Sequence, residues 1–324
     1  MTRHFFPLLA IVLFGATAAP ACGNSSPAPA PSDGGSPPSA WRSAVGAAGV
    51  FAQTFDDVAW RTRIVAPRAL RGVACVGNLA GWVAGDGGFV AHTEDGGVTW
   101  NAEDAHVTDT LHTIRFGTRS IGVVAGARGA LAVTDDGGKS WRVAPALTTA
   151  TLRSAAVTAD GARMIVVGDG GALLRSGDAG VTWAASARAL AAGADLRGVA
   201  IDPEAHVVLV VDARGGVWAS SDGGVGFAAE ADAPSPLDAV AMSDDGAQAF
   251  AVGAGGTVLV RTAPRTWTLA PRATTADLHA ALVSEGRLYA AGEGGTLLGS
   301  RDGGESWSLR PLATTAALYG LDDL

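Results

Sequence analysis

Short apolar runs separated by glycine-rich turns fill most of the chain. Between Leu70 and Trp100 the runs are LRGVACV, GWVAG and FVAHT, and Trp100 begins a fourth run that continues into NAE. Short strands at even spacing, with turn signals between them, predict an all-β structure. No stretch with the period of a useful helix follows the apolar segment at the N-terminus. We therefore expect strands to build the fold.

This four-strand unit recurs along the chain. An aromatic residue closes each copy, and these residues are Trp60, Trp100, Trp141, Trp183, Phe227, Trp267 and Trp307. The steps between them are 40, 41, 42, 44, 40 and 40 residues. Four short strands in about 40 residues are typical of one blade of a β-propeller.

Counting the copies predicts a closed ring. The first strand of a copy begins at Leu70, Leu111, Leu152, Leu196, Leu237, Leu278 and Leu318. Residues 43–63 supply the later strands of a copy without a first strand, and residues 318–324 supply a first strand alone. We predict an all-β fold, a seven-bladed β-propeller of four-stranded antiparallel blades, in which 318–324 pairs with 43–63 and closes the ring.

A glycine ends the turn between the second and third strands of every copy. These residues are Gly49, Gly88, Gly129, Gly171, Gly215, Gly256 and Gly295. A tight hairpin needs a positive φ at such a site, which glycine adopts at little cost. A phosphate-binding loop is the alternative interpretation, but such loops open helices, and here a strand follows each turn.

The sequence TEDGGVTW at 93–100 marks the turn between the third and fourth strands. Its aspartate recurs, and the full set is Asp95, Asp136, Asp178, Asp222 and Asp302. We expect Asp95 to accept backbone N–H bonds across the turn. We also expect Thr93 and Thr99 to bond to each other, and Trp100 to pack between blades. No loop gathers the six or more oxygens that calcium needs, so we expect no metal.

These motifs resemble known repeats. The pattern S/T-x-D-x-G-x-T/S-W is similar to the Asp-box, or BNR repeat, of sialidases and sortilin-type receptors. The fuller unit, L-x-x-V followed by GWVAGDGGFVAHTEDGGVTW, resembles the photosystem II stability/assembly factor family over about residues 43–324. The resemblance implies a propeller that acts without catalysis as an assembly factor and holds a membrane-protein subunit through an arginine-rich patch. The motif of that patch has no residue-by-residue match here.

The residue after each first-strand leucine is polar or amphipathic. We call this set the mouth ring: Arg71, His112, Arg153, Arg197, Asp238, His279 and Tyr319. Repeat symmetry places it at the mouth of the central channel, with Arg128 and Arg214 in adjacent turns. In one interpretation these side chains solvate the mouth or pair with acids such as Asp86, Asp169 and Glu293. In the other they capture an acidic or C-terminal segment of a partner protein through charge-assisted hydrogen bonds.

The N-terminus predicts export. Residues 1–21 are predicted to be a signal peptide, because MTRH precedes an apolar run too short to span a membrane and remain there. Cys22 follows Ala-Pro-Ala, a peptidase site that also resembles the lipobox of bacterial lipoproteins, so acylation and simple secretion both stay open. Residues 22–40 form a Pro/Ser/Gly-rich tether, and 41–324 form the propeller. We expect an envelope lipoprotein, periplasmic, outer-membrane anchored or at the cell surface. Cys75 is expected to be a small buried side chain without a disulfide.

Charge and composition narrow the function. A net charge of −8 argues against a nucleic-acid partner. We expect a non-enzymatic, lipid-anchored scaffold that binds an envelope or membrane protein and needs no cofactor. A non-catalytic carbohydrate- or surface-binding propeller is an alternative, although the loops are poor in aromatic residues. A sialidase-like glycosidase needs an arginine triad, a Tyr–Glu nucleophile pair and paired carboxylates. The chain has only Tyr289 and Tyr319, Tyr289 lies in the second-strand run RLYAAG and is expected to be a core residue, and no carboxylate pair outside the repeats presents itself.

Overall fold

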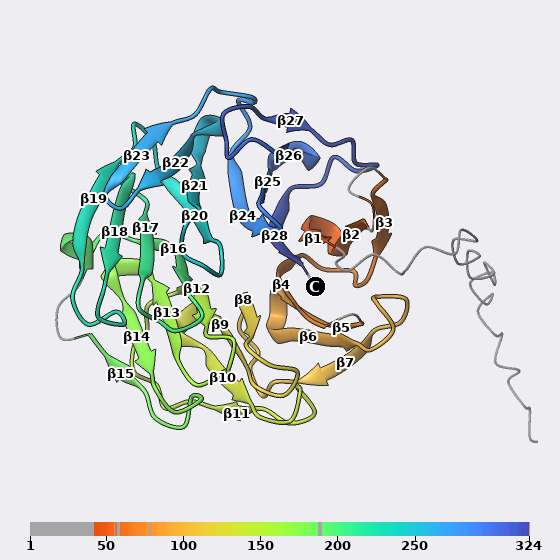
Figure 1. Ribbon diagram of the computed structural model, residues 1–324. Coiled ribbons are helices and arrows are strands. Elements are labelled where there is room, and N and C mark those ends of the chain that lie inside the picture. Colours follow the sequence, from red (N-terminus) through yellow and green to blue (C-terminus); the bar gives the residue numbers. More distant parts are fainter. Residues whose placement is uncertain (1–41, 55, 57–58, 78, 187–189, 324) are drawn as a thin grey trace, which may run out of the picture. The chain divides into compact units, whose positions relative to one another are not determined.

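The structure is a computed structural model, and the residues that it describes are 42–54, 56, 59–77, 79–186 and 190–323. They form seven four-stranded sheets arranged in a ring (Figure 1). Strands that are neighbours in a sheet run antiparallel, as in the pairs of the first blade. The predicted seven-bladed β-propeller is therefore confirmed. The predicted signal peptide, the tether and Cys22 lie outside the described residues.

The strands of each blade are given from the inside of the ring outward. Blade 1 consists of β28 (Leu318–Asp323), β1 (Arg42–Gly46), β2 (Val50–Thr54) and β3 (Arg61–Ile64). Blade 2 consists of β4 (Leu70–Val76), β5 (Ala80–Gly85), β6 (Phe89–Thr93) and β7 (Asn101–Asp104). Blade 3 consists of β8 (Leu111–Phe116), β9 (Gly122–Gly126), β10 (Leu131–Thr134) and β11 (Arg142–Val143). Blade 4 consists of β12 (Leu152–Val157), β13 (Met164–Gly168), β14 (Leu173–Ser176) and β15 (Ala184–Ala185).

The remaining blades follow the same order. Blade 5 consists of β16 (Leu196–Ile201), β17 (Val208–Asp212), β18 (Gly216–Ser220) and β19 (Ala228–Asp232). Blade 6 consists of β20 (Leu237–Met242), β21 (Ala249–Gly253), β22 (Val258–Ala263) and β23 (Thr266–Leu269). Blade 7 consists of β24 (Leu278–Ser284), β25 (Arg287–Gly292), β26 (Leu297–Ser300) and β27 (Ser308–Leu309).

Short 3-10 turns join the second and third strands of six blades. They are η1 (Ala47–Gly49), η2 (Asp86–Gly88), η3 (Ala127–Gly129), η4 (Asp169–Gly171), η6 (Ala254–Gly256) and η7 (Glu293–Gly295). A further 3-10 segment, η5 (Leu190–Gly193), precedes β16. No helix among the described residues is long and apolar enough to cross a membrane.

The hydrophobic core is divided into layers between adjacent blades. The second strands are buried at nearly every position, whereas both residues of β11, β15 and β27 are exposed. Between blades 3 and 4, Leu131 and Val133 pack in one cluster with Leu152 and Met164. Blades therefore bury both faces of their middle strands, which explains why these strands read as continuous apolar runs.

The two ends of the described chain complete blade 1. β28 pairs with β1 in antiparallel register, with Ala44 opposite Leu321 and Arg42 opposite Asp323. Leu321 is 2 % exposed and lies in a cluster that also contains Tyr289 of blade 7. The predicted closure of the ring by the C-terminal strand is confirmed. The expectation that Tyr289 is a core residue is confirmed by its 1 % exposure.

The Asp-box turns are held by hydrogen bonds centred on their aspartate. The Thr99 N–H donates to Asp95 Oδ1 at 2.9 Å, and the Thr99 hydroxyl donates to Asp95 Oδ2 at 2.6 Å. The expected direct bond between Thr93 and Thr99 is wrong, because the Thr93 hydroxyl donates to Asp95 Oδ1 at 2.8 Å instead. The hydrogen bonds hold the pKa of Asp95 below its usual value despite partial burial. Trp100 packs edge-on against Phe51 of blade 1, with ring centroids 5.2 Å apart, as expected for a residue between blades.

Equivalent aspartates repeat this arrangement. Each accepts from a Ser or Thr two residues earlier and from a backbone N–H four residues later, at Asp136, Asp178, Asp222 and Asp302. All of their bonds stay within the turn. The interpretation of these aspartates as structural residues is thereby supported by geometry.

The glycine that ends each second turn has a positive φ. The values range from 71° at Gly88 to 95° at Gly215. In blade 6 a Cβ added at Gly256 would lie 2.0 Å from the Thr274 carbonyl oxygen. Its neighbour Gly255 also has a positive φ, of 63°, but has no atom within 4 Å of an added Cβ. A side chain at Gly255 would meet only the strain of a positive φ, whereas one at Gly256 would also collide with backbone atoms.

Gly256→Ala should therefore destabilise the fold far more than Gly255→Ala. The Gly255 site needs only a left-handed residue, at a cost of about 1 kcal/mol. The equivalent positions already hold Ala48 and Arg128, both at a φ of 54°. Gly256→Ala adds a collision with backbone and should cost about 4 kcal/mol or more, or prevent folding. Urea unfolding of both variants measures the difference, and equal costs would contradict this account of the turn.

Candidate functional site

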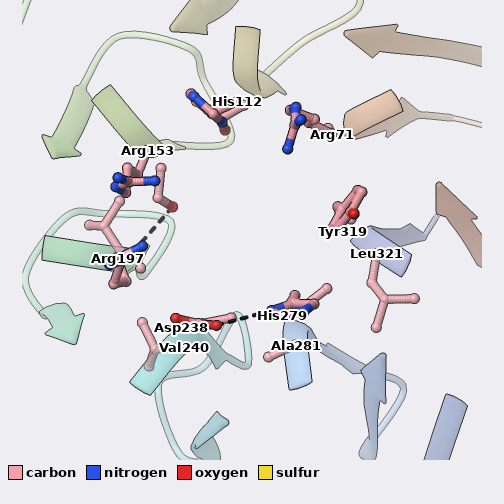
Figure 2. A pocket seen from close by; sticks show the side chains of 18 of the residues that line it. Arg71, His112, Arg153, Arg197, Asp238, Val240, His279, Ala281, Tyr319 and Leu321 are labelled. Carbon is pink, nitrogen blue, oxygen red and sulfur yellow. Dashed lines mark hydrogen bonds and ion pairs between the residues drawn. The ribbon is translucent and has the colours of Figure 1, made fainter. Parts of the chain in front are cut away.

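The mouth ring lies around a single central cavity. All seven of its residues line that cavity, and Figure 2 shows them following one another around it in chain order. The arrangement that repeat symmetry predicted is confirmed, since each residue comes from the innermost strand of a different blade. Whether the ring binds a partner stays a prediction.

A β-bulge aims each of these side chains. In blade 2, Leu70 pairs with Gly85 and Gly72 pairs with Ala84, so Arg71 is the extra residue between them. The same register shift occurs at the start of the innermost strand in the other blades. A bulge leaves its extra residue out of the ladder and redirects its side chain. The sequence gives the position of the ring but not this cause.

Carboxylates in the turns hold three of the ring residues. Arg71 Nε donates to Asp86 Oδ1 at 2.6 Å, and Arg153 Nη2 donates to Asp169 Oδ2 at 2.8 Å. His279 lies with Nε2 3.0 Å from Glu293 Oε1. These three pairs agree with the interpretation in which ring residues pair with neighbouring acids, and capture of a partner stays a prediction.

The ring also has contacts between blades. His279 Nδ1 lies 3.0 Å from Asp238 Oδ2 of blade 6. The Tyr319 ring lies between two neighbours, with its centroid 5.4 Å from Arg71 Cζ and 5.8 Å from the His279 ring centroid. Guanidinium groups over aromatic faces are mutually attractive. Arg71, Tyr319, His279 and Asp238 thus form a continuous chain of contacts along one side of the mouth.

The two histidines of the ring have opposite pKa shifts. Burial, with the charges of Arg71 and Arg153, lowers the pKa of His112 to about 4. The hydrogen bond with Asp238, aided by the one with Glu293, outweighs burial and raises the pKa of His279. Near neutral pH, the blade 3 side of the mouth therefore carries a neutral imidazole beside two guanidinium groups.

The structure does not bring Arg128 and Arg214 into the cavity. Arg128 is in η3 with its side chain 76 % exposed, and it forms an ion pair with Asp109. Arg214 is exposed in the turn after β17. Both lie in the turns next to the mouth, outside the residues that line it. Repeat symmetry predicts their place in the adjacent turns but not that their side chains are exposed.

The cavity has further polar lining residues that were not predicted from the sequence. Arg115 lines the cavity from β8, and its Nη1 donates to the Val73 carbonyl oxygen at 2.7 Å. The Ser154 hydroxyl accepts a bond from the Val199 N–H at 3.3 Å. Both are polar residues on an innermost strand beyond the ring position, which is the signal that would have found them.

The cavity lining bears on the alternative functions. Asp238 is the one carboxylate among the described residues that line the cavity, so the paired carboxylates of a glycosidase are not assembled there. The described residues contain no group of three or more His, Cys, Asp or Glu side chains that could hold a metal ion. Cys75 is a free, partly buried cysteine whose thiol pKa is raised by burial.

Fold and site together define an Asp-box β-propeller with a polar, predominantly cationic channel mouth. The family model described as photosynthesis system II assembly factor YCF48 matches residues 99–281. This match spans more than half of the chain, so the protein belongs to that family. No curated protein matches the sequence.

Solved structures agree on the fold. The structure of YCF48 bound to a D1 peptide is 19 % identical, with a TM-score of 0.61 over 78 % of this chain and 89 % of that one. YCF48 from Cyanidioschyzon merolae is 18 % identical, with a TM-score of 0.60 over 76 % of this chain and 86 % of that one. A nidogen/laminin complex chain is 10 % identical, with a TM-score of 0.57 over 88 % of this chain and 98 % of that one. At these identities the likeness establishes the propeller fold alone.

Acid should affect the two histidines of the ring in opposite senses. The folded pKa of His112 is below its ordinary 6.5, so stability is lost as the pH falls from there towards 4. The folded pKa of His279 is raised above 6.5, so its contribution is present below that pH and is lost as the pH rises through the raised value. His112→Gln should reduce the loss of stability between about pH 7 and about pH 5, whereas His279→Gln should destabilise more at about pH 5 than at about pH 8. Urea unfolding tests both, and NMR titration curves on the same side of 6.5 would contradict the assignment.

Proposed function

We propose that this protein is a non-enzymatic scaffold that holds a partner protein at the rim around its channel mouth. The observation that carries the proposal is the convergence of the mouth ring, contributed by seven blades, on one cavity. Membership of an assembly-factor family supports it. A structure of YCF48 holds a D1 peptide, and we extend that binding of a polypeptide to this chain by analogy.

The chemistry of the mouth favours an acidic or C-terminal segment. Guanidinium groups present several donors in a fixed plane that suits a carboxylate, and charge-assisted hydrogen bonds are stronger than neutral ones. Four arginines line the cavity, against the single carboxylate of Asp238 among the described lining residues. The chain is acidic overall, so the mouth is a local exception to the charge of the whole protein.

We further propose that the protein acts as a lipoprotein of the bacterial envelope. The support is the N-terminal sequence, in which an apolar segment ends at Ala-Pro-Ala before Cys22 and a Pro/Ser/Gly-rich tether follows. A lipid on Cys22 and a tether without apolar content would leave the propeller free to reach a membrane protein. The proposed partner is accordingly an envelope or membrane protein.

Affinity capture tests the scaffold function. The tagged mature protein is crosslinked mildly in native envelopes, and the enriched proteins are identified. One membrane protein should be enriched, and Arg71→Glu, Arg153→Glu and Arg197→Glu together should abolish its capture through charge repulsion. A matched triple variant, Arg119→Glu, Lys139→Glu and Arg265→Glu, changes the same charge at exposed residues outside the cavity and should keep it. Circular dichroism confirms folding, and equal loss in both variants, or no enrichment at all, would refute the proposal.

Acylation has its own test. Metabolic labelling with a fatty acid should mark the wild-type protein, and Cys22→Ser should remove both the label and the membrane association. Cys75→Ser, at the other cysteine of the chain, should change neither. A wild-type protein that carries no label would show simple secretion instead.

A further inference from the structure

The mouth ring follows a rule of charge compensation within each blade. In three blades the ring residue is a cation and the first residue of the 3-10 turn between the second and third strands is an acid: Asp86 for Arg71, Asp169 for Arg153 and Glu293 for His279. The turn places this acid beside the bulge, so each pair closes locally. In these cations, some of the N–H donors are already hydrogen-bonded to a carboxylate of the protein and are not available to a ligand.

Blade 5 breaks the rule. Its ring residue is Arg197, but the corresponding position of its turn, directly after β17, holds Ala213. The acid stands one position earlier, at Asp212, which is 2 % exposed. Asp212 is occupied inside the blade, because Oδ1 accepts from the Arg214 N–H at 2.7 Å and Oδ2 accepts from Trp218 Nε1 at 2.8 Å.

The carboxylate nearest to Arg197, that of Asp195, is hydrogen-bonded to a different group. Asp195 Oδ2 lies 3.8 Å from Arg197 Nη2, whereas Asp195 Oδ1 accepts from the Gly170 N–H at 3.0 Å. Asp277, at the equivalent position in blade 7, accepts from the Gly255 N–H at 2.7 Å in the same way. The ring residue of blade 7 is His279, so this type of bond forms without an arginine at the ring position. The bond between Asp195 and the Gly170 N–H therefore stabilises the neighbouring turn and does not depend on Arg197.

Arg197 therefore keeps unused donors. Its Nε is shielded from solvent and has no hydrogen-bond partner among the described residues, although the side chain as a whole is 30 % exposed. Figure 2 shows it between Arg153 and Asp238 on the wall of the cavity. Arg214, from the turn of the same blade, forms no ion pair with any described residue. Among the cations of the mouth ring, the positive charge least occupied by acids of the protein therefore lies at blade 5.

We propose that Arg197, with Arg214 at the rim, is the specificity-determining contact of the mouth and binds a carboxylate of the partner polypeptide. This inference rests on the proposed function, because it names the chemical group that the same site takes. Arg71 and Arg153 shape the cavity and set its potential, while their donors remain with Asp86 and Asp169. A planar carboxylate suits the free edge of one guanidinium group.

A small dicarboxylate tests the site without the partner. Glutarate is titrated into the full mature chain while the ring resonances of His112 are followed by NMR. Saturable shifts should appear, and the pKa of His112 should rise as a negative charge enters the cavity. Arg197→Gln should weaken glutarate binding about tenfold or more, as for the loss of a charge-assisted bond, and the matched variant Arg153→Gln should weaken it less than about threefold. Equal weakening by the two variants would overturn the inference.

Two control probes fix the chemistry. Glutaramide, which has the same shape without charge, should not shift His112. Saturable binding of inorganic phosphate without binding of glutarate would overturn the choice of a carboxylate.

The capture experiment separates this inference from the proposed function. Arg197→Gln alone should lose the crosslinked partner, Arg153→Gln should weaken its capture less, and Arg265→Gln, at an exposed residue outside the cavity, should retain it. A partner that is captured equally by Arg197→Gln refutes the inference and leaves the scaffold function standing. Glutarate binding at Arg197 with no partner captured by the wild type refutes the scaffold function and upholds the carboxylate site.

Discussion

The pairing of β28 with β1 is the contact on which the rest of the ring depends. It joins segments from the two ends of the described chain, and it supplies blade 1 with its innermost strand. Without it, β1 would present an unpaired edge and the cluster around Leu318 and Leu321 would lose the strand that fills it. The pairing also sets Tyr319 between Arg71 and His279. The same strand pairing therefore closes the ring and completes the mouth ring with Tyr319.

The ring supplies equivalent backbone positions, and side-chain differences between blades give them different properties. The same bulge recurs at the start of every innermost strand, so the backbone places one ring residue at an equivalent position in each of the seven blades. On six blades a 3-10 turn lies beside the bulge, and the residue at its first position determines whether a ring cation is paired. In blade 5 this position holds Ala213, and the preceding acid, Asp212, accepts a hydrogen bond from Trp218 inside the blade and does not pair with Arg197. Asymmetry in the mouth arises from single substitutions on a symmetric frame.

The sequence predicts those features that depend on the repeat alone. The period, the closing strand and the mouth ring follow from alignment of the copies, since equal positions in a propeller occupy equal places around the axis. What depends on side-chain direction does not follow. Thr93 and Thr99 each reach Asp95 and not each other, Arg128 points outward to Asp109, and Arg115 turns into the cavity. These outcomes are set by rotamers and by contacts across blades, which a repeat alignment does not contain.

The balance of charges at the mouth explains how a cationic cavity is stable in an acidic protein. Several guanidinium groups close together repel one another, and partial burial strengthens that repulsion. Asp86 and Asp169 relieve it at Arg71 and Arg153, and His112 relieves it further by staying neutral at neutral pH. Arg197 remains 30 % exposed, so water still solvates part of its charge. A ligand carboxylate would replace that water and supply a closer counter-charge than Asp195, which lies 3.8 Å away, whereas at Arg71 and Arg153 it would first have to displace an acid of the protein.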